Sequence, residues 1–152
     1  MIQEINQGNA EQLHIRAEEI DLDELQRPEF KNILEDLKDT FDSIKNSTHG
    51  LSMNQIWKYS DRPFRVFIAW KPEQDKPEVF INPRGVGSGG TIRNDEGCTS
   101  FQKKGTKKKG RHKNYTIVYI REDGSEASFK VGPPWSRVLQ HEMDHLDGKT
   151  LF

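Results

Sequence analysis

The chain has 152 residues, of which 32% are hydrophobic and 31% charged, and its formal net charge is −1. This length suits one compact domain, so we expect residues 1–152 to form a single domain. A net charge near zero excludes a general attraction to nucleic acid or anionic membranes, although a local patch can still bind either. No stretch approaches the roughly 20 apolar residues that cross a membrane, and the N-terminus lacks the pattern of a secretion signal. Cys98 is the single cysteine, so no disulfide can form within the chain, and we expect a cytoplasmic protein. We also expect no membrane partner.

The first predicted element is an amphipathic helix. Residues 1–22 are polar and weakly patterned, which indicates an extended arm with short turns. Pro28 suits the first position of a helix, and apolar residues then recur at helical spacing. These residues are Phe30, Ile33, Leu34, Leu37, Phe41 and Ile44. The small and polar residues 46–50 then favour the end of the helix.

Two pairs of strands are predicted after this helix. Residues 65–70 and 78–81 are rich in β-branched and aromatic side chains, and a turn with proline and aspartate separates them. We expect Asn82-Pro83 to end the second strand, because proline cannot donate a hydrogen bond to a sheet. Residues 115–120 and 127–131 flank Asp123-Gly124, a dipeptide typical of hairpin turns, which predicts a second hairpin.

A glycine-rich segment, residues 85–90, matches the Gly-x-Gly-x-x-Gly pattern of dinucleotide sites. That pattern needs a helix after it, whose N-terminus holds the pyrophosphate. Residues 91–96 have no helical apolar stripe. We therefore reject a nucleotide site and expect a flexible connection.

The segment 103–113 is strongly basic. Its cations are Lys103, Lys104, Lys107, Lys108, Lys109, Arg111 and Lys113. Such a run can neutralise the phosphates of RNA or DNA, but only Phe101 and Tyr115 are near enough in sequence to stack on bases. Two interpretations stay open: a solvated hairpin tip, or a loop that contacts RNA or the ribosome.

A second helix is predicted near the end of the chain. Residues 132–134, glycine followed by two prolines, end the last strand, and apolar residues follow at neighbouring helical positions. On this helix His141 and His145 lie one turn apart on one face, as two ligands of a single metal must. Imidazoles suit Zn²⁺ or Fe²⁺, and Glu142 beside them can take a proton from water. Without a third ligand, two solvated histidines explain the motif equally well.

Cys98 can supply that third ligand. A lone cysteine is more often buried filler. A thiolate with two imidazoles, however, leaves a tetrahedral metal one open position for water.

Three motifs in the same order resemble those of the peptide deformylases. They are residues 140–148 around the histidine pair, Glu96-Gly97-Cys98-Thr99-Ser100, and Gly50-Leu51-Ser52-Met53-Asn54-Gln55. The resemblance extends over nearly the whole chain. It implies an α+β fold, in which antiparallel strands surround a central helix that carries the histidines.

The resemblance also implies an activity and a cofactor. Family members are metal-dependent hydrolases that remove the N-terminal formyl group from formyl-methionyl nascent polypeptides and release formate. Carried over motif by motif, the ligands of one divalent metal are Cys98, His141 and His145. Fe(II) is the expected native metal, and Zn, Ni or Co can occupy such a site.

Catalytic roles follow from the same resemblance. Glu142 is the expected general base, and the oxyanion is expected to be stabilised by the Gln55 amide and the Thr99 backbone N–H. The expected substrate-binding residues are Gly50, Gly97, His49, Arg137 and Val138. We hypothesise that the polar pair His49 and Arg137 makes the pocket less selective for methionine.

The chain departs from the family pattern at several positions near the motifs. Thr48 stands in place of a glycine, Ser52 and Met53 in place of two alanines, and Thr99 in place of a leucine. The loss of small residues indicates a reshaped pocket floor. The chain also ends seven residues after His145, so we expect a short form without the family's C-terminal helix, of bacterial or phage origin. We also expect a monomer.

Two other functions remain open from the residues alone. A general zinc peptidase can use the same histidine motif with Glu142, although it has no use for Cys98 and Gln55. A binding module that has lost catalysis can instead use the basic segment on RNA or the ribosome.

Overall fold

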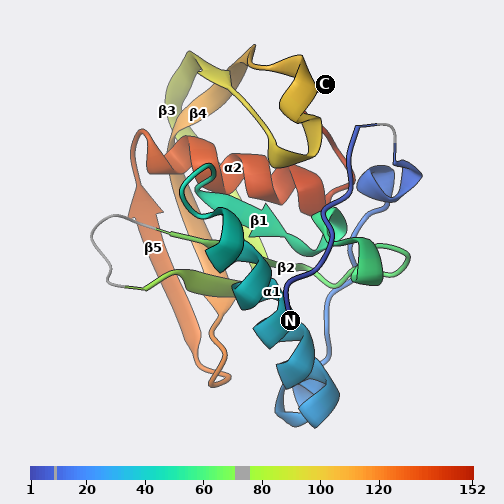
Figure 1. Cartoon of the computed structure of the whole chain (residues 1–152). Helices are drawn as coiled ribbons and strands as arrows, with labels where there is room; N and C mark the ends of the chain where they lie inside the picture. Colours follow the sequence, from blue (N-terminus) through green and yellow to red (C-terminus); the bar gives the residue numbers. More distant parts are fainter. Residues whose placement is uncertain (9, 71–75) are drawn as a thin grey trace.

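The computed structural model describes residues 1–8, 10–70 and 76–152, and this part of the chain combines one antiparallel sheet with two α-helices (Figure 1). The five strands are neighbours in chain order. They are β1 (Gly50–Ser52), β2 (Val66–Ala69), β3 (Glu78–Glu96), β4 (Lys107–Ile120) and β5 (Glu126–Val131). The helices are α1 (Pro28–Ile44) and α2 (Trp135–Leu146), with the short 3-10 helices η1 (Glu11–His14), η2 (Leu22–Gln26), η3 (Met53–Gln55), η4 (Trp57–Tyr59) and η5 (Thr99–Lys104). The predicted α+β class is confirmed.

Helices α1 and α2 pack on opposite faces of the sheet, because successive side chains of a strand point to opposite faces. On β2, Val66 and Ile68 belong to the buried cluster that contains Phe30 and Phe41 of α1. Phe67, between them, belongs to the cluster that contains Leu139 of α2. The predicted first helix, with its apolar stripe in the core, is confirmed. Among the described residues, no helix has the length and hydropathy to cross a membrane.

The prediction that Asn82-Pro83 ends a strand is wrong. β3 continues to Glu96, with a shift in its pairing to β4 between Ile81 and Arg84. Proline is tolerated at such a bulge, where the ladder is already interrupted. Asn82 has a positive φ of 47°, and its side-chain amide bonds the backbone of Ile20 in both directions.

The flexible connection predicted for residues 85–90 is also wrong, because these residues lie within β3. A Cβ on Gly85 would lie 1.9 Å from the Tyr115 hydroxyl oxygen, and one on Gly87 would lie 2.0 Å from the His112 ring. The glycines therefore make room for aromatic side chains of β4 that lie across β3.

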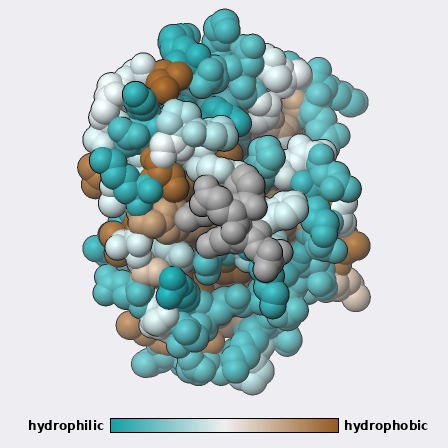
Figure 2. All heavy atoms as spheres, turned by 90° about the vertical axis from the view of Figure 1, so that its left-hand side faces the viewer, coloured by the Kyte–Doolittle hydropathy of each residue, from teal (hydrophilic) through white to brown (hydrophobic). Residues whose placement is uncertain are grey.

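The basic segment is not a loop. Lys103 and Lys104 end η5, while residues 107–113 lie in β4, so only residues 105 and 106 connect them. The predicted hairpin around Asp123-Gly124 is confirmed, since Ile120 of β4 pairs with Glu126 of β5. The turn predicted between β2 and β3 includes residues 71–75, which lie outside the described residues. On the face that carries β5, the surface is mainly hydrophilic and its hydrophobic side chains are scattered (Figure 2).

Candidate metal centre

Helix α2 presents the histidine pair, as the sequence predicts. Leu139 and Leu146 pack into the core beneath the helix. The intervening turns direct His141 and His145 towards the segment between β3 and η5. Their Nε2 atoms lie 3.2 Å apart, and the His145 side chain is fully buried.

Cys98 reaches the same point from the segment between β3 and η5. Its Sγ lies 3.3 Å from Nε2 of His145, and the donor atoms of Cys98, His141 and His145 all lie within 4.8 Å of one another. In a tetrahedral site with bonds of about 2.0–2.3 Å, ligand atoms lie about 3.3–3.6 Å apart. The arrangement therefore fits a single metal ion between these three side chains.

Glu96 orients the first histidine. Nδ1 of His141 lies 3.0 Å from Oε1 of Glu96, and a carboxylate can only accept, so Nδ1 carries the proton. Nε2 is then left to donate its lone pair to a metal. Burial alone would raise the pKa of the Glu96 carboxyl, but hydrogen bonds from His141 and Arg111 lower it to about 2.

Arg111 holds Glu96 in place. Its guanidinium donates two bonds to the Glu96 carboxylate, at 2.8 and 2.9 Å, and a third to Asp144 on α2. The sequence interpretation counted Arg111 among the cations of the basic segment, yet only 8% of its side chain is exposed. The roles of Glu96 and Arg111 were missed. The position of Glu96, two residues before the metal ligand Cys98, is the feature of the sequence that could have indicated its role.

Glu142 follows His141 on α2 and lies against Gly50 of β1. It is buried, and among the described residues its Oε2 has no hydrogen-bond partner. Burial raises the pKa of its carboxyl to about 7. A Cβ at position 50 would lie 2.8 Å from Oε1 of Glu142, so Gly50 is needed for this close approach.

Gln55 directs its amide nitrogen into the site. Ser52 precedes η3 as its N-cap, and its backbone N–H and hydroxyl both donate to Oε1 of Gln55, at 3.0 and 3.2 Å. Nε2 of Gln55 consequently faces the hydroxyl oxygens of Ser100 and Thr99, at 3.1 and 3.2 Å, and Sγ of Cys98, at 3.7 Å. The amide orientation is fixed before any substrate binds.

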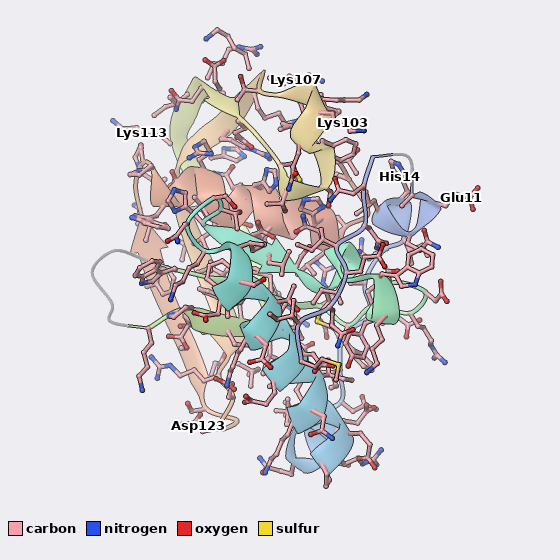
Figure 3. All side chains as sticks on the ribbon, viewed as in Figure 1. Glu11, His14, Lys103, Lys107, Lys113 and Asp123 are labelled. Carbon is pink, nitrogen blue, oxygen red and sulfur yellow. The ribbon has the colours of Figure 1, made fainter. Side chains whose placement is uncertain are left out.

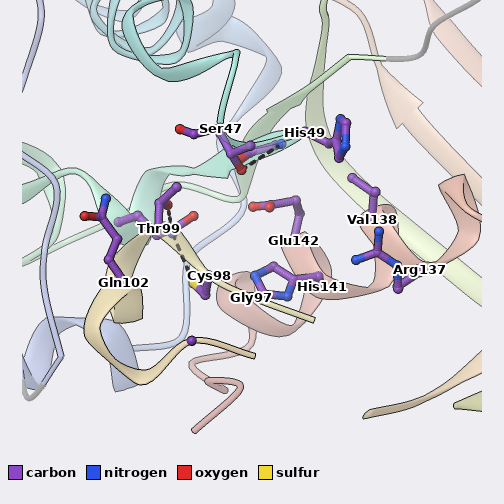
Figure 4. A pocket seen from close by; sticks show the side chains of 14 residues that line it. Ser47, His49, Gly97, Cys98, Thr99, Gln102, Arg137, Val138, His141 and Glu142 are labelled. Carbon is purple, nitrogen blue, oxygen red and sulfur yellow. Dashed lines mark hydrogen bonds between the residues drawn. The ribbon is translucent and has the colours of Figure 1, made fainter. Parts of the chain in front are cut away.

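These groups open into one cleft of about 610 Å³ (Figure 4). Its lining residues are Ser47, Thr48, His49, Gly50, Gln55, Gly97, Cys98, Thr99, Gln102, Gly105, Arg137, Val138, His141 and Glu142. Every site residue predicted from the sequence is in this set except His145, whose side chain is fully buried. Of the residues behind the predicted reshaped floor, Ser52 and Met53 are fully buried and do not line the cleft, whereas Thr48 does.

The electrostatics of the two histidines differ. Burial would lower the pKa of His141, but contacts with Cys98 and Glu96 raise it to about 10. Burial and the neighbouring charge of His141 lower the pKa of His145 well below its usual value. Metal ions compete with protons for such groups, so binding here is coupled to proton release.

The sequence is similar to known proteins over most of its length. The sequence profile of the polypeptide deformylase family matches residues 2–152. A peptide deformylase from Stenotrophomonas maltophilia is 31% identical over 146 residues, which cover 92% of this chain and 79% of that protein. One from Chlorobaculum parvum is 38% identical over 124 residues, covering 80% and 65%.

Solved structures share the fold. A class I type b peptide deformylase from Acinetobacter baumannii superposes with a TM-score of 0.85 at 22% identity, covering 99% of this chain and 97% of that one. The peptide deformylase from Thermotoga maritima gives a TM-score of 0.82 at 24% identity, covering 99% and 95%.

Proposed function

The chain belongs to the peptide deformylase family, and on that premise we propose that the geometry of its cleft performs deformylation. The enzyme is a metal-dependent hydrolase that removes the N-terminal formyl group from formyl-methionyl nascent polypeptides and releases formate. One observation carries the assignment of roles: three metal donors, a buried carboxylate and a fixed amide converge in a single cleft.

Cys98, His141 and His145 would hold the metal. A thiolate and two imidazoles suit several divalent ions, so the donor set alone does not select one. We propose Fe(II) as the native ion, with Zn, Ni or Co able to replace it. When bound, such an ion supplies Lewis acidity, which activates water and polarises a carbonyl group.

Glu142 moves the protons. Its pKa of about 7 is near the operating pH, which suits a general base. We assign its unpartnered Oε2 to take a proton from the attacking water. A C–O bond forms at the formyl carbon and the C–N bond breaks. Glu142 then gives its proton to the leaving amine, which yields formate and a free N-terminus.

Gln55 and Thr99 stabilise the charge that develops on the formyl oxygen. The position of Nε2 of Gln55 is fixed because Oε1 of the same amide accepts a hydrogen bond from Ser52. The N–H of Thr99 lies at the start of η5, where no acceptor within that helix is available. Donors placed in advance cost no reorganisation during the reaction. The threonine side chain at position 99 is compatible with this role, since the backbone N–H is the donor.

The substrate chain would lie along β1. This strand is at the edge of the sheet, so one of its sides has no neighbouring strand among the described residues. An extended peptide can add to such an edge. Its first residue would then contact His49, Val138 and Arg137, with Gly50 and Gly97 close to the scissile bond.

We also propose a cytosolic location and a phosphate-bearing partner such as ribosomal RNA. Lys103, Lys107 and Lys113 lie at the end of the molecule that carries the β3–β4 ribbon, away from Asp123 (Figure 3). All three are exposed. Arg111 does not contribute to this surface, because it is committed to Glu96 and Asp144. Salt-sensitive binding of ribosomes, weakened by reversing these lysine charges, would support the contact.

The test of deformylation is formate release from a formyl-Met peptide by anaerobically purified protein, with metal quantified on the same sample. We expect about one metal per chain. In Glu142→Gln, which keeps the shape of the side chain but cannot act as a base, kcat should fall by about 10²–10⁴ with metal content unchanged. A metal-loaded wild-type protein that releases no formate would contradict the proposal.

A further inference from the structure

Arg137 is a charged side chain in the cleft for which the described residues offer no partner. It is half-buried, and it makes no ion pair or side-chain hydrogen bond within the described part of the chain. The two most buried arginines are partnered: Arg65 bonds Asp147 at 2.8 Å, and Arg111 bonds Glu96. A partly desolvated charge without a protein partner is costly, and a ligand of opposite charge in the cleft would compensate it.

The position of Arg137 sets which part of a substrate it can reach. It lies one helical turn before His141, so both side chains share one face of α2. Arg137 and Val138 lie on one side of Glu142, and Thr99 and Gln102 lie on the other (Figure 4). A substrate whose formyl group reacts beside Glu142 and whose first residue lies against Val138, as proposed above, passes Arg137 within its first residues.

The cleft lacks the lining expected of a purely apolar pocket. Sites for apolar groups are lined mainly by hydrophobic and aromatic side chains. Here, hydroxyl, amide, imidazole and guanidinium groups surround Val138, the one aliphatic side chain among the described lining residues. Arg137 is also the only lysine or arginine in that described set. Its guanidinium matches a carboxylate through two parallel hydrogen bonds.

We propose that Arg137 binds a side-chain carboxylate of the substrate, either on the residue after the formylated methionine or on a first residue that replaces methionine, and that the enzyme prefers peptides with that acidic residue. The inference rests on the deformylase function proposed above and names a substrate class for the same cleft. An acidic residue at either position supplies the same carboxylate group, and two pairs of peptides distinguish the two positions.

The experiment measures formate release by the metal-loaded enzyme from C-terminally amidated peptides. Formyl-Glu-Ala-Ser is compared with formyl-Gln-Ala-Ser, and formyl-Met-Glu-Ser with formyl-Met-Gln-Ser. We expect the glutamate peptide of one pair to have about a ten-fold higher kcat/KM, since hydrogen bonds between charged groups are the strong ones. The difference should lie in KM, because the contact is the same in ground and transition states.

Arg137→Gln should remove this preference, and Arg137→Lys should keep part of it. Arg62→Gln is the matched control, because Arg62 is 86% exposed, lies outside the cleft and should not affect the preference. Preference in the first pair identifies the first side chain as the ligand, and preference in the second pair identifies its neighbour. Equal rates within both pairs, or a preference that survives in Arg137→Gln, would overturn the inference.

Failure of the proposed function gives a different result. If no peptide releases formate, deformylation itself is contradicted. Calorimetric binding of the deformylated Glu and Gln peptides then still decides the role of Arg137. Tighter binding of the glutamate product, lost in Arg137→Gln, supports the carboxylate contact, and equal binding refutes it.

Discussion

The inner side of the cleft, around Glu96 and Arg111, is buried and hydrogen-bonded, whereas its outer side, around His49, is exposed and has few internal contacts. On the inner side, Glu96 is bonded by both His141 and Arg111. On the outer side, the one ring contact of the exposed His49 among the described residues is with the edge of Trp135, at a centroid distance of 5.6 Å. An active site needs rigidly held side chains where bonds break, whereas the side chains that recognise the substrate can be held less tightly. Changes on the inner side should therefore act on every substrate, and changes on the outer side should act selectively.

The largest effect is expected from removal of a metal ligand. Cys98→Ala should lose bound metal and deformylase activity for all peptides, because two imidazoles alone leave the site incomplete. Metal analysis and formate release measure both losses. His14→Ala is the control, since His14 is exposed on η1, and it should retain both. Full metal content in Cys98→Ala would favour a histidine-based peptidase site.

An intermediate effect is expected when a side chain that only orients a ligand is changed. Glu96→Gln should lower metal affinity by about 10–100-fold, because residues behind metal ligands typically contribute that much. The change also leaves the buried Arg111 charge poorly compensated. Competition with a chelator measures the affinity. Asp95→Asn, at the exposed neighbouring position, is the matched control and should bind metal as wild type does. An unchanged metal affinity in Glu96→Gln would show that Glu96 does not stabilise the metal site.

The smallest effect is expected on the outer side. His49→Leu replaces an exposed polar ring by an apolar side chain at the proposed first-residue pocket. We predict that KM for formyl-Met-Ala-Ser falls less than about ten-fold while kcat stays the same, since such a contact binds ground and transition states alike. The selectivity for methionine over glutamine at that position should rise. A large loss of kcat would mean that the two sides are not separable.

Much of this cleft could be predicted because its signals are local. His141, Glu142 and His145 lie within five residues on one helix, and the apolar spacing before them defines that helix. α1 has an apolar stripe and a proline at its start, and it begins at the predicted Pro28 and ends at Ile44, just before the predicted end signal at residues 46–50. Short motifs and helical periods depend on neighbours in sequence, so they can be interpreted without the fold.

The missed features depend on contacts between distant segments. Proline and glycine ordinarily favour turns, but Pro83 sits at a bulge and Gly85 and Gly87 lie beneath side chains of β4. Arg111 resembles its lysine neighbours in sequence. Only the pairing of β3 with β4 turns it inward to Glu96. Strand register is set by the whole sheet, and the segment itself does not encode it.

The most direct test of the metal centre is a titration of metal-free protein with Co(II), followed by near-ultraviolet absorption of the cobalt–thiolate bond and by formate release. The structure predicts that both signals rise together and saturate at about one equivalent, as expected for a single site with one thiolate and two imidazoles. Both should be absent in Cys98→Ala. Activity without metal, or a thiolate signal that does not track activity, would contradict the assignment of Cys98, His141 and His145 as the catalytic metal site.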